Sequence, residues 1–311
     1  MLRLLLLFVL GVAAGWGAVA VAAEAIGRGV KPRGELVDIG GRRLRLVCEG
    51  PKSERPVIWM EAGAFSGAAD FAALQQKLAA KGLRSCAYDR AGMGWSDPGP
   101  EPRDGDAIVD DLEKLIAKSG EPGPFVLMGH SMAGLYVRQY ALRNPDKVVG
   151  VVLLDAVTPQ MIGLPGAQTF VDRMTDLARL GAAAGPLKAP LYWWGDRIGL
   201  PAAGKAEKRR GFISARQSRS AYAEVLQWRT AAEQALAAGD YRPEWPIAVI
   251  TAGPPSARME AWNAVRQAPA KAARAGMVDN VDVASHTTML GLTHGDRVVA
   301  GVDFVLKAAG R

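Results

Sequence analysis

The sequence of residues 124–138 is PFVLMGHSMAGLYVR, in which an apolar run, a serine between small residues and a helix-forming run follow one another directly. We expect a strand, a sharp turn and a helix. A serine hydroxyl is a poor nucleophile in water, so it needs a nearby base and N–H groups that stabilise an oxyanion. Gly129 and Ala133, two residues before and after Ser131, must be small because such a turn brings their backbones together. We interpret the segment as a nucleophile elbow.

The composition favours one sizeable globular domain with an insertion. Of the 311 residues, 49% are hydrophobic and 22% are charged, which argues against a disordered or repetitive chain. The net charge of +7 comes from scattered lysines and arginines without interleaved aromatic residues, so we expect no nucleic-acid partner. A role in solubility or at a membrane surface explains the charge better. We expect no cofactor and no metal.

The N-terminal segment is strongly apolar. Leu4 to Ala23 are 20 consecutive residues without charge. A helix of that length, at ~1.5 Å per residue, crosses a hydrocarbon core of ~30 Å. The small residues of Ala18-Val19-Ala20 and Ala20-Val21-Ala22 also suit a signal peptidase. We favour an uncleaved single-pass membrane anchor over a cleaved signal that would release a secreted or periplasmic chain.

Strands and helices alternate along the rest of the chain. Apolar or alternating runs predict a strand before the elbow and others at 35–39, 43–48, 56–60, 83–88, 148–154, 247–251 and 281–284. Residues at helical spacing predict helices near 71–78, 108–116 and 298–306. This alternation indicates an α/β fold with a mostly parallel sheet of eight strands and helices on both faces.

One segment lacks strands. Residues 158–241 are too long for a single crossover and contain only helix-like runs, so we predict a helical cap over the carboxyl ends of the strands. The predicted organisation is an anchor or signal segment with its linker at 1–33, a core at 34–157 and 242–311, and the cap at 158–241. The aromatic residues of the cap either pack within it or contact substrate. They are Tyr192, Trp193, Trp194, Phe212, Tyr222 and Trp228.

The segment Tyr88 to Ser96, YDRAGMGWS, follows the fourth predicted strand. The elbow, the strand order and the inserted cap together resemble the α/β-hydrolase fold family, and this segment resembles the Asp-x-x-Gly-x-Gly-x-Ser turn of that family. The resemblance covers about Glu35 to Ala309 and implies a serine hydrolase. It also implies that Asp89 and Arg90 serve the turn and its packing, not the chemistry. Family resemblance indicates a fold better than a substrate.

In that family the oxyanion hole combines the N–H after the nucleophile, here Met132, with an N–H from the loop after the third strand. Members often carry His-Gly there, whereas this chain has Ala62-Gly63-Ala64. The resemblance therefore places the second donor at Ala64. Glu61 is either a functional acid or a structural residue of the loop, and we favour the structural role.

The general base must be one of three histidines. His130 lies inside the elbow, where the turn should direct its side chain away from the Ser131 hydroxyl. His294 falls in a Thr-x-x-acid pattern and belongs to the first turn of the final helix. His286 directly follows the last predicted strand, where the family's base sits. We predict His286 as the base.

The triad acid is harder to assign. It usually follows the seventh strand, but here no acid precedes Glu260, which already lies in a predicted helix. Asp155 ends the sixth strand beside the elbow strand, and some lipases of this fold carry their acid there. We favour Asp155 and keep Glu260 as the alternative, with another carboxylate or none still open.

The two cysteines fall on the second and fourth predicted strands, which are neighbours in the strand order that the resemblance implies. Cys48 and Cys86 form a disulfide outside the cytoplasm or remain two small buried side chains. We favour buried thiols, because a direct cross-strand bridge is strained.

We expect a membrane-associated serine hydrolase that cleaves a carboxylic ester with an apolar part, through an acyl-enzyme on Ser131. Serine at the elbow argues against dehalogenases and epoxide hydrolases, in which an aspartate would be expected there. Thioester, amide or C–C bonds remain alternative targets. A protein of another class, which binds a ligand or signals with slow or no turnover, is the alternative function.

Overall fold

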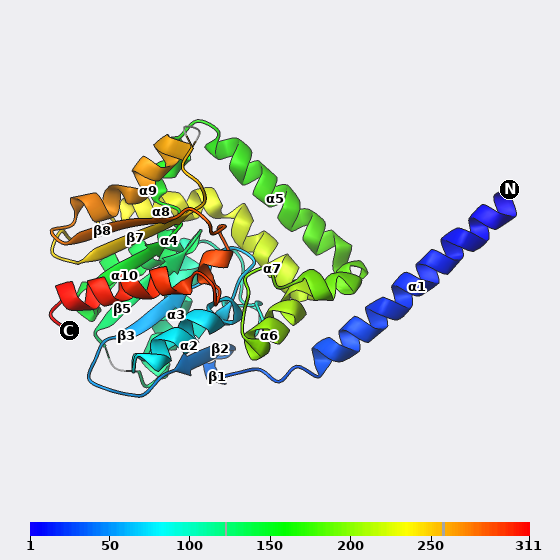
Figure 1. Ribbon diagram of the computed structural model, residues 1–311, viewed down its shortest axis with the longest axis horizontal. Coiled ribbons are helices and arrows are strands. Elements are labelled where there is room, and N and C mark those ends of the chain that lie inside the picture. The colour runs from blue at the N-terminus through cyan, green and yellow to red at the C-terminus, as the bar shows by residue number, and fades with distance from the viewer. Residues whose placement is uncertain (122, 257–258) are drawn as a thin grey trace.

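The computed structural model describes residues 1–121, 123–256 and 259–311 (Figure 1). Its sheet has eight strands in the order β1-β2-β4-β3-β5-β6-β7-β8. The strands are β1 (Glu35–Asp38), β2 (Arg43–Glu49), β3 (Val57–Glu61), β4 (Ser85–Tyr88), β5 (Phe125–His130), β6 (Val148–Leu154), β7 (Ile247–Ala252) and β8 (Gly276–Val281). Pairing is antiparallel from β1 to β2 and from β2 to β4, and parallel elsewhere. The predicted mostly parallel eight-stranded sheet is confirmed.

Helices cover both faces of this sheet, as Figure 1 shows. On one face α2 (Ala72–Ala80) packs beside α10 (Gly295–Ala308). On the other lie α3 (Gly105–Lys118), α4 (Ala133–Arg143), α8 (Trp228–Ala237) and α9 (Glu260–Ala272). The central strands β3, β5 and β6 are almost entirely buried, as expected for parallel strands covered on both sides.

The last strand differs from the prediction. We expected it at 281–284, but β8 ends at Val281 and residues 282–287 form a loop. Its exposed and half-buried residues alternate because β8 is the edge strand of the sheet. The apolar residues from which we predicted this strand therefore lie mostly in the loop after it, where Val283 is exposed. His286 follows the strand by five residues instead of directly.

Helices occupy the described chain between β6 and β7. They are α5 (Ala167–Ala184), α6 (Ala202–Ile213), α7 (Ala215–Leu226) and α8, with the 3-10 helices η3 (Pro159–Gly163) and η4 (Gly185–Trp194). Further 3-10 helices are η1 (Ala68–Phe71), η2 (Pro145–Lys147) and η6 (Thr288–Leu290). The predicted cap boundaries at 158 and 241 stay a prediction.

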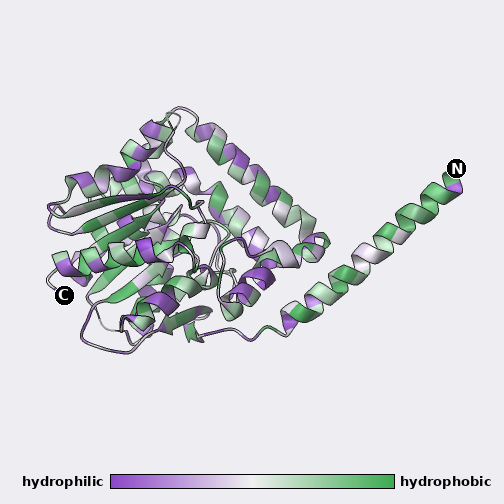
Figure 2. Cartoon of the chain, viewed as in Figure 1, coloured by the Kyte–Doolittle hydropathy of each residue, from purple (hydrophilic) through white to green (hydrophobic). Residues whose placement is uncertain are grey.

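The N-terminal helix α1 (Leu2–Arg28) projects from the body of the molecule (Figure 1). Most of its outward half is apolar, as the largely green ribbon in Figure 2 shows, with the charged Arg3 near the N-terminus. An 18-residue window within it has a mean hydropathy of 2.4, and none of that window is buried in the protein. The helix is long and apolar enough to cross a membrane, although a signal sequence meets the same criterion.

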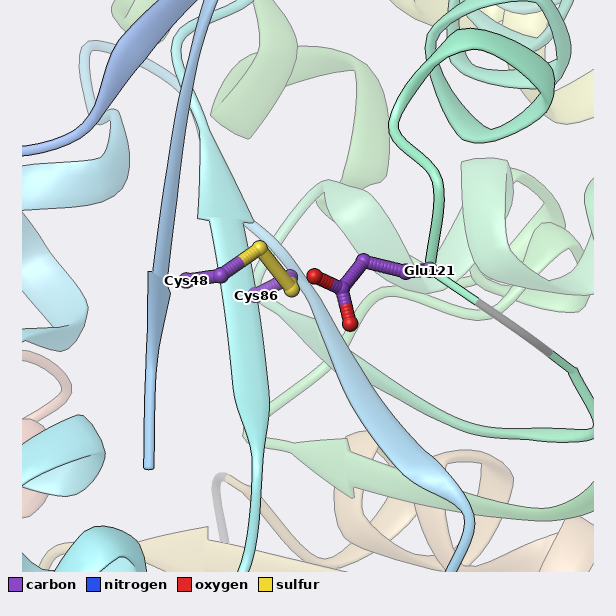
Figure 3. Close-up of side chains that lie close together, drawn as sticks. All are labelled: Cys48, Cys86 and Glu121. Atoms are coloured by element: carbon purple, nitrogen blue, oxygen red, sulfur yellow. A yellow bond between two sulfur atoms is a disulfide. The ribbon is translucent and has the colours of Figure 1, made fainter. Parts of the chain in front are cut away.

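A disulfide joins Cys48 and Cys86 (Figure 3), so the favoured prediction of two free thiols is wrong. The residues face each other in the antiparallel β2–β4 register with their Cα atoms 4.1 Å apart. Closely spaced pairs of this kind bring two side chains within bonding distance. Glu121 lies beside the bridge, but Arg84 Nε donates to its carboxylate at 2.7 Å. Because the two sulfur atoms are bonded to each other, we interpret Cys48, Cys86 and Glu121 as structural residues.

Candidate active site

The elbow has the backbone that its sequence predicts. Ser131 has a φ of +57°, in the left-handed region that a non-glycine residue seldom adopts. A Cβ atom at Gly129 would lie 2.8 Å from Val137 Cγ2, and one at Gly134 would lie 2.3 Å from the Val157 carbonyl oxygen. Only glycine fits these two positions. The close packing fixes the turn, which holds Ser131 at the carboxyl end of β5.

Asp155 and His286 meet beside this turn, although 131 residues separate them in the chain. His286 Nδ1 donates to Asp155 Oδ2 at 2.5 Å. This bond fixes the tautomer and leaves Nε2 of His286 free to accept a proton. Ser131 and His286 line the same cavity, but in the described part of the chain no hydrogen bond joins them. Catalytic hydrogen bonds in ligand-free structures often form only with substrate.

Asp155 is held from its other side by a residue that the sequence analysis missed. Arg266 Nη1, on α9, lies 2.9 Å from Asp155 Oδ1. Burial would raise the pKa of Asp155, but the hydrogen bond from His286 and the charge of Arg266 lower it below its ordinary value. The carboxylate therefore stays ionised and can stabilise a positively charged imidazole. Asp155 also has a positive φ, of 41°.

The other two histidines occupy different positions. His130 is buried, and its Nε2 donates to the backbone carbonyl of His286 at 2.8 Å. Its ring lies against that of His286, with centroids 4.5 Å apart. Burial, with a smaller contribution from His286, lowers the pKa of His130 to about 3. His130 is therefore a neutral ring that supports the His286 loop. His294 is the N-cap residue of α10 and is not in its first turn, contrary to our expectation.

Glu260, the alternative acid, begins α9 and is exposed. No hydrogen bond or ion pair links it to His286 among the described residues. The structure thus brings Asp155, and not Glu260, to the histidine.

The loop after β3 approaches the elbow closely. A Cβ atom at Gly63 would lie 2.8 Å from Ser131 Cβ, so glycine is required there. Ala64, the next residue, lines the cavity with Ser131. Phe65 has a φ of +62°, and with Ser131 and Asp155 it completes the set of non-glycine residues with positive φ in the described chain. Ser131 and Asp155 line the cavity, and Phe65 directly follows Ala64, which lines it too.

A buried charge cluster holds this loop. Arg90 Nη2 donates to the Gly63 carbonyl at 2.9 Å, and its Nη1 donates to Glu61 at 2.7 Å. Glu224 of α7 accepts from Nε and Nη2 of the same arginine. Burial raises the pKa of Glu61, although Arg90 and the hydroxyl of Tyr88 oppose this. Glu61 and Arg90 thus have the structural roles that the sequence favoured, and Arg90 also links the loop to a cap helix.

A cavity of about 940 Å³ contains Ser131, Asp155 and His286. Its apolar walls come from the cap, the β6 end and α9: Val157, Met161, Phe170, Met174, Trp228 and Trp262. Of the cap aromatics considered from the sequence, Trp228 alone lines this cavity in the described chain, and Tyr192 is buried elsewhere. Sequence reasoning missed Phe170, Trp262 and Arg266. The spacing of Met259, Trp262 and Arg266 along one helical face was the available signal.

The chain resembles known hydrolases throughout its core. A family model described as alpha/beta hydrolase fold matches residues 56–245. The solved structure of a thermophilic esterase from Thermogutta terrifontis superposes with a TM-score of 0.61 at 19% identity, over 90% of this chain and 100% of that one. The structure of E-2-(acetamidomethylene)succinate hydrolase gives a TM-score of 0.64 at 19% identity, over 87% and 98%. At this identity the likeness shows the fold alone.

The proteins that are similar in sequence match a smaller part of this chain than the solved structures do. The uncharacterized protein YbdG of Bacillus subtilis is 28% identical over 131 residues, which are 42% of this chain and 40% of that protein. An uncharacterized Schizosaccharomyces pombe protein is 27% identical over 218 residues, or 70% of this chain and 40% of that protein. The matches thus span about 40% of the length of each relative. The family model, by contrast, matches more than half of this chain, which therefore belongs to the alpha/beta hydrolase fold family.

Proposed function

We propose that the protein is a serine hydrolase that cleaves carboxylic esters through an acyl-enzyme on Ser131. Family membership and hydrolase neighbours support hydrolase activity in general. The observation that carries the finer proposal is the 2.5 Å contact between His286 and Asp155, in the cavity that the strained Ser131 lines. Backbone strain is found at active sites and at ligand-binding sites alike, but a histidine paired with a carboxylate beside a serine is the arrangement that activates a serine nucleophile.

The proposed reaction has two stages, formation of the acyl-enzyme and its hydrolysis by water, and His286 transfers a proton in both. His286 Nε2 accepts the Ser131 proton as the hydroxyl oxygen attacks the acyl carbon, and Asp155 stabilises the imidazolium. The N–H groups of Met132 and Ala64 stabilise the oxyanion. The C–O bond to the alcohol then breaks and His286 returns the proton to the leaving oxygen. Water, deprotonated by His286, releases the acid and restores Ser131.

The substrate class follows from the cavity walls. Aromatic and aliphatic side chains line most of the space around Ser131, including Phe170, Trp228 and Trp262. Such walls favour an ester with an apolar acyl or alcohol part. We expect activity on p-nitrophenyl esters to rise with chain length until the cavity is filled.

We also propose that α1 is retained as a membrane anchor and that the domain lies outside the cytoplasm. The length and hydropathy of α1 support the anchor. The Cys48–Cys86 disulfide supports an oxidising compartment, where such bonds persist. An anchored chain stays in the membrane fraction after a carbonate wash and keeps its N-terminal sequence. A soluble chain beginning near Ala23 would refute the anchor.

Labelling with a fluorophosphonate tests the catalytic proposal. The protein should react, whereas Ser131→Ala should neither react nor hydrolyse p-nitrophenyl butyrate. Because the residue is small and its neighbours are already tightly packed, this variant should keep the wild-type melting temperature. Undiminished labelling of the alanine variant would refute Ser131 as the nucleophile.

A further inference from the structure

The second half of α1 packs against the cap instead of standing clear of it. Trp16 Nε1 donates to the Leu187 carbonyl of η4 at 2.8 Å. Further along, Ala23 is completely buried in a small apolar cluster with Tyr192 of η4 and Ile213 of α6. The contact between α1 and the cap therefore extends from Trp16 to the end of the apolar segment.

This contact limits how a membrane can be placed on the molecule. Residues Leu2 to Trp16 rise only about 22 Å, which is less than the ~30 Å of a hydrocarbon core. A spanning segment must therefore include residues beyond Trp16, where η4 already packs on the helix. If the core ends near Ala23, Leu187 lies about 10 Å below its surface. A helix tilted in the bilayer needs still more of these residues.

The surface of the cap at this level is apolar. η4 exposes Leu187, Leu191, Trp193 and Trp194, with 68%, 38%, 43% and 61% of each residue accessible. Phe212 of α6 adds to them, since it packs beside Gly195 directly after η4 and is 40% exposed. We call these five residues the η4 face. Tryptophans beside leucines are typical of protein surfaces at the membrane interface.

One positive charge lies beside the η4 face, and two more follow the apolar part of α1. Arg28 and Lys31 are exposed directly after the apolar part of α1. Arg209 donates to the Trp193 carbonyl at 3.2 Å. Cations placed just outside an inserted apolar surface attract anionic lipid headgroups. The overall charge of +7 has the same sign.

We propose that the η4 face is inserted into the interface of an anionic bilayer that α1 spans. This proposal rests on the anchor in the proposed function and extends it to the cap. The arrangement links the membrane to the active site, because α5 lines the cavity through Phe170 and Met174 and its other end contacts η4. The cavity-lining residues lie about 15 Å or more along α5 from η4. The insertion holds the cap at the membrane, so we expect it to favour hydrolysis of an ester dissolved in the bilayer and not of an ester in water.

Depth-dependent quenching tests the position of the η4 face. Full-length Leu187→Cys and Trp194→Cys proteins carry an environment-sensitive fluorophore, which reacts only at the new thiol because the native cysteines are bonded. Val278→Cys on the edge strand β8, far from α1 in Figure 1, is the control. The proteins are placed in vesicles of phosphatidylcholine and phosphatidylglycerol, with or without doxyl-labelled lipid.

Doxyl lipid should lower the emission from positions 187 and 194 about twofold or more, and leave position 278 unchanged. Equal emission with and without doxyl lipid at 187 and 194 would overturn the proposal. So would failure of the protein to float with the vesicles. These readouts need no enzymatic activity, so they stand even if the serine-hydrolase proposal fails.

Kinetics provide a second test through the double variant Leu187→Asp/Trp194→Asp. It should hydrolyse a long-chain fluorogenic ester in those vesicles about tenfold more slowly or worse, because two apolar side chains no longer enter the lipid. Its kcat/KM for water-soluble p-nitrophenyl acetate should equal that of the unaltered protein, which shows that the domain is folded. If the double variant hydrolysed both esters as fast as the unaltered protein does, the proposal would be overturned. No hydrolysis of either ester by the unaltered protein would refute the proposed activity instead.

Discussion

Replacing His130 with glutamine should make the fold less sensitive to acid. Burial, and secondarily His286, lower the pKa of His130 to about 3. In the unfolded chain the same ring has a pKa of about 6.5. As the pH falls below 6.5, the unfolded chain therefore binds a proton that the folded protein excludes. The stability linked to His130 is complete above about pH 6.5 and is lost progressively toward pH 3.

The size of the effect follows from this difference. At pH 5 the unfolded ring is about 1.5 pH units below its pKa, and each unit corresponds to ~1.36 kcal/mol. His130 should therefore account for about 2 kcal/mol of the stability lost between pH 7.5 and pH 5. Glutamine is the suitable replacement, because its amide N–H can still donate to the His286 carbonyl while nothing titrates.

Urea unfolding of the full-length protein in mild detergent at pH 7.5 and pH 5 measures this stability difference, with tryptophan fluorescence as the signal. The free energy of unfolding of His130→Gln should fall about 2 kcal/mol less than that of the unaltered protein between pH 7.5 and pH 5. Nitrogen NMR of labelled histidine should show a neutral His130 with the proton on Nε2 at pH 5. Identical losses in the two proteins, or a His130 titration midpoint near 6.5, would refute the reasoning.

Three other predictions concern the site and its support. Asp155→Asn should lower kcat on the order of 10⁴-fold with little change in KM, and should lower the melting temperature because Arg266 loses its counter-ion. Glu260→Gln should retain activity, and the reverse pattern in steady-state assays would reassign the acid. The Cys48→Ser/Cys86→Ser variant should lose up to about 4 kcal/mol of unfolding free energy, because the bridge closes a loop with a sequence separation of 38; unchanged urea midpoints would contradict this. Gly134→Ala should cost about 1–3 kcal/mol, since its methyl group meets a backbone carbonyl, and calorimetry that finds no loss would show that the turn relaxes.

Local patterns were enough to predict most of the fold. The run before Ser131 and the small residues around it predicted a strand, turn and helix, and β5 and α4 flank the serine as expected. Buried strands such as β6 were found at the correct bounds because both of their faces are apolar. The edge strand β8 was misplaced for the opposite reason, since its half-exposed pattern carries little apolar signal.

Contacts between segments that are distant in the sequence were harder to predict. The position of Asp155 at a strand end suggested its role, but only the folded chain shows Arg266 on its second oxygen and His130 beneath the His286 loop. The disulfide was misjudged because we expected strain to disfavour a direct cross-strand bridge, whereas Cys48 and Cys86 face each other in the register of β2 against β4 and are bonded. The packing of α1 on η4 had no sequence signal at all, since both segments are simply apolar.

The most direct test of the central proposal is to locate the acyl group during turnover. The protein is mixed with p-nitrophenyl butyrate, quenched in acid within the first turnover, and digested for mass spectrometry. We predict that the mass of one butyryl group appears on the peptide that contains Ser131, and that it is absent from Ser131→Ala. A butyryl group on another residue, or hydrolysis that continues undiminished in Ser131→Ala, would contradict the account.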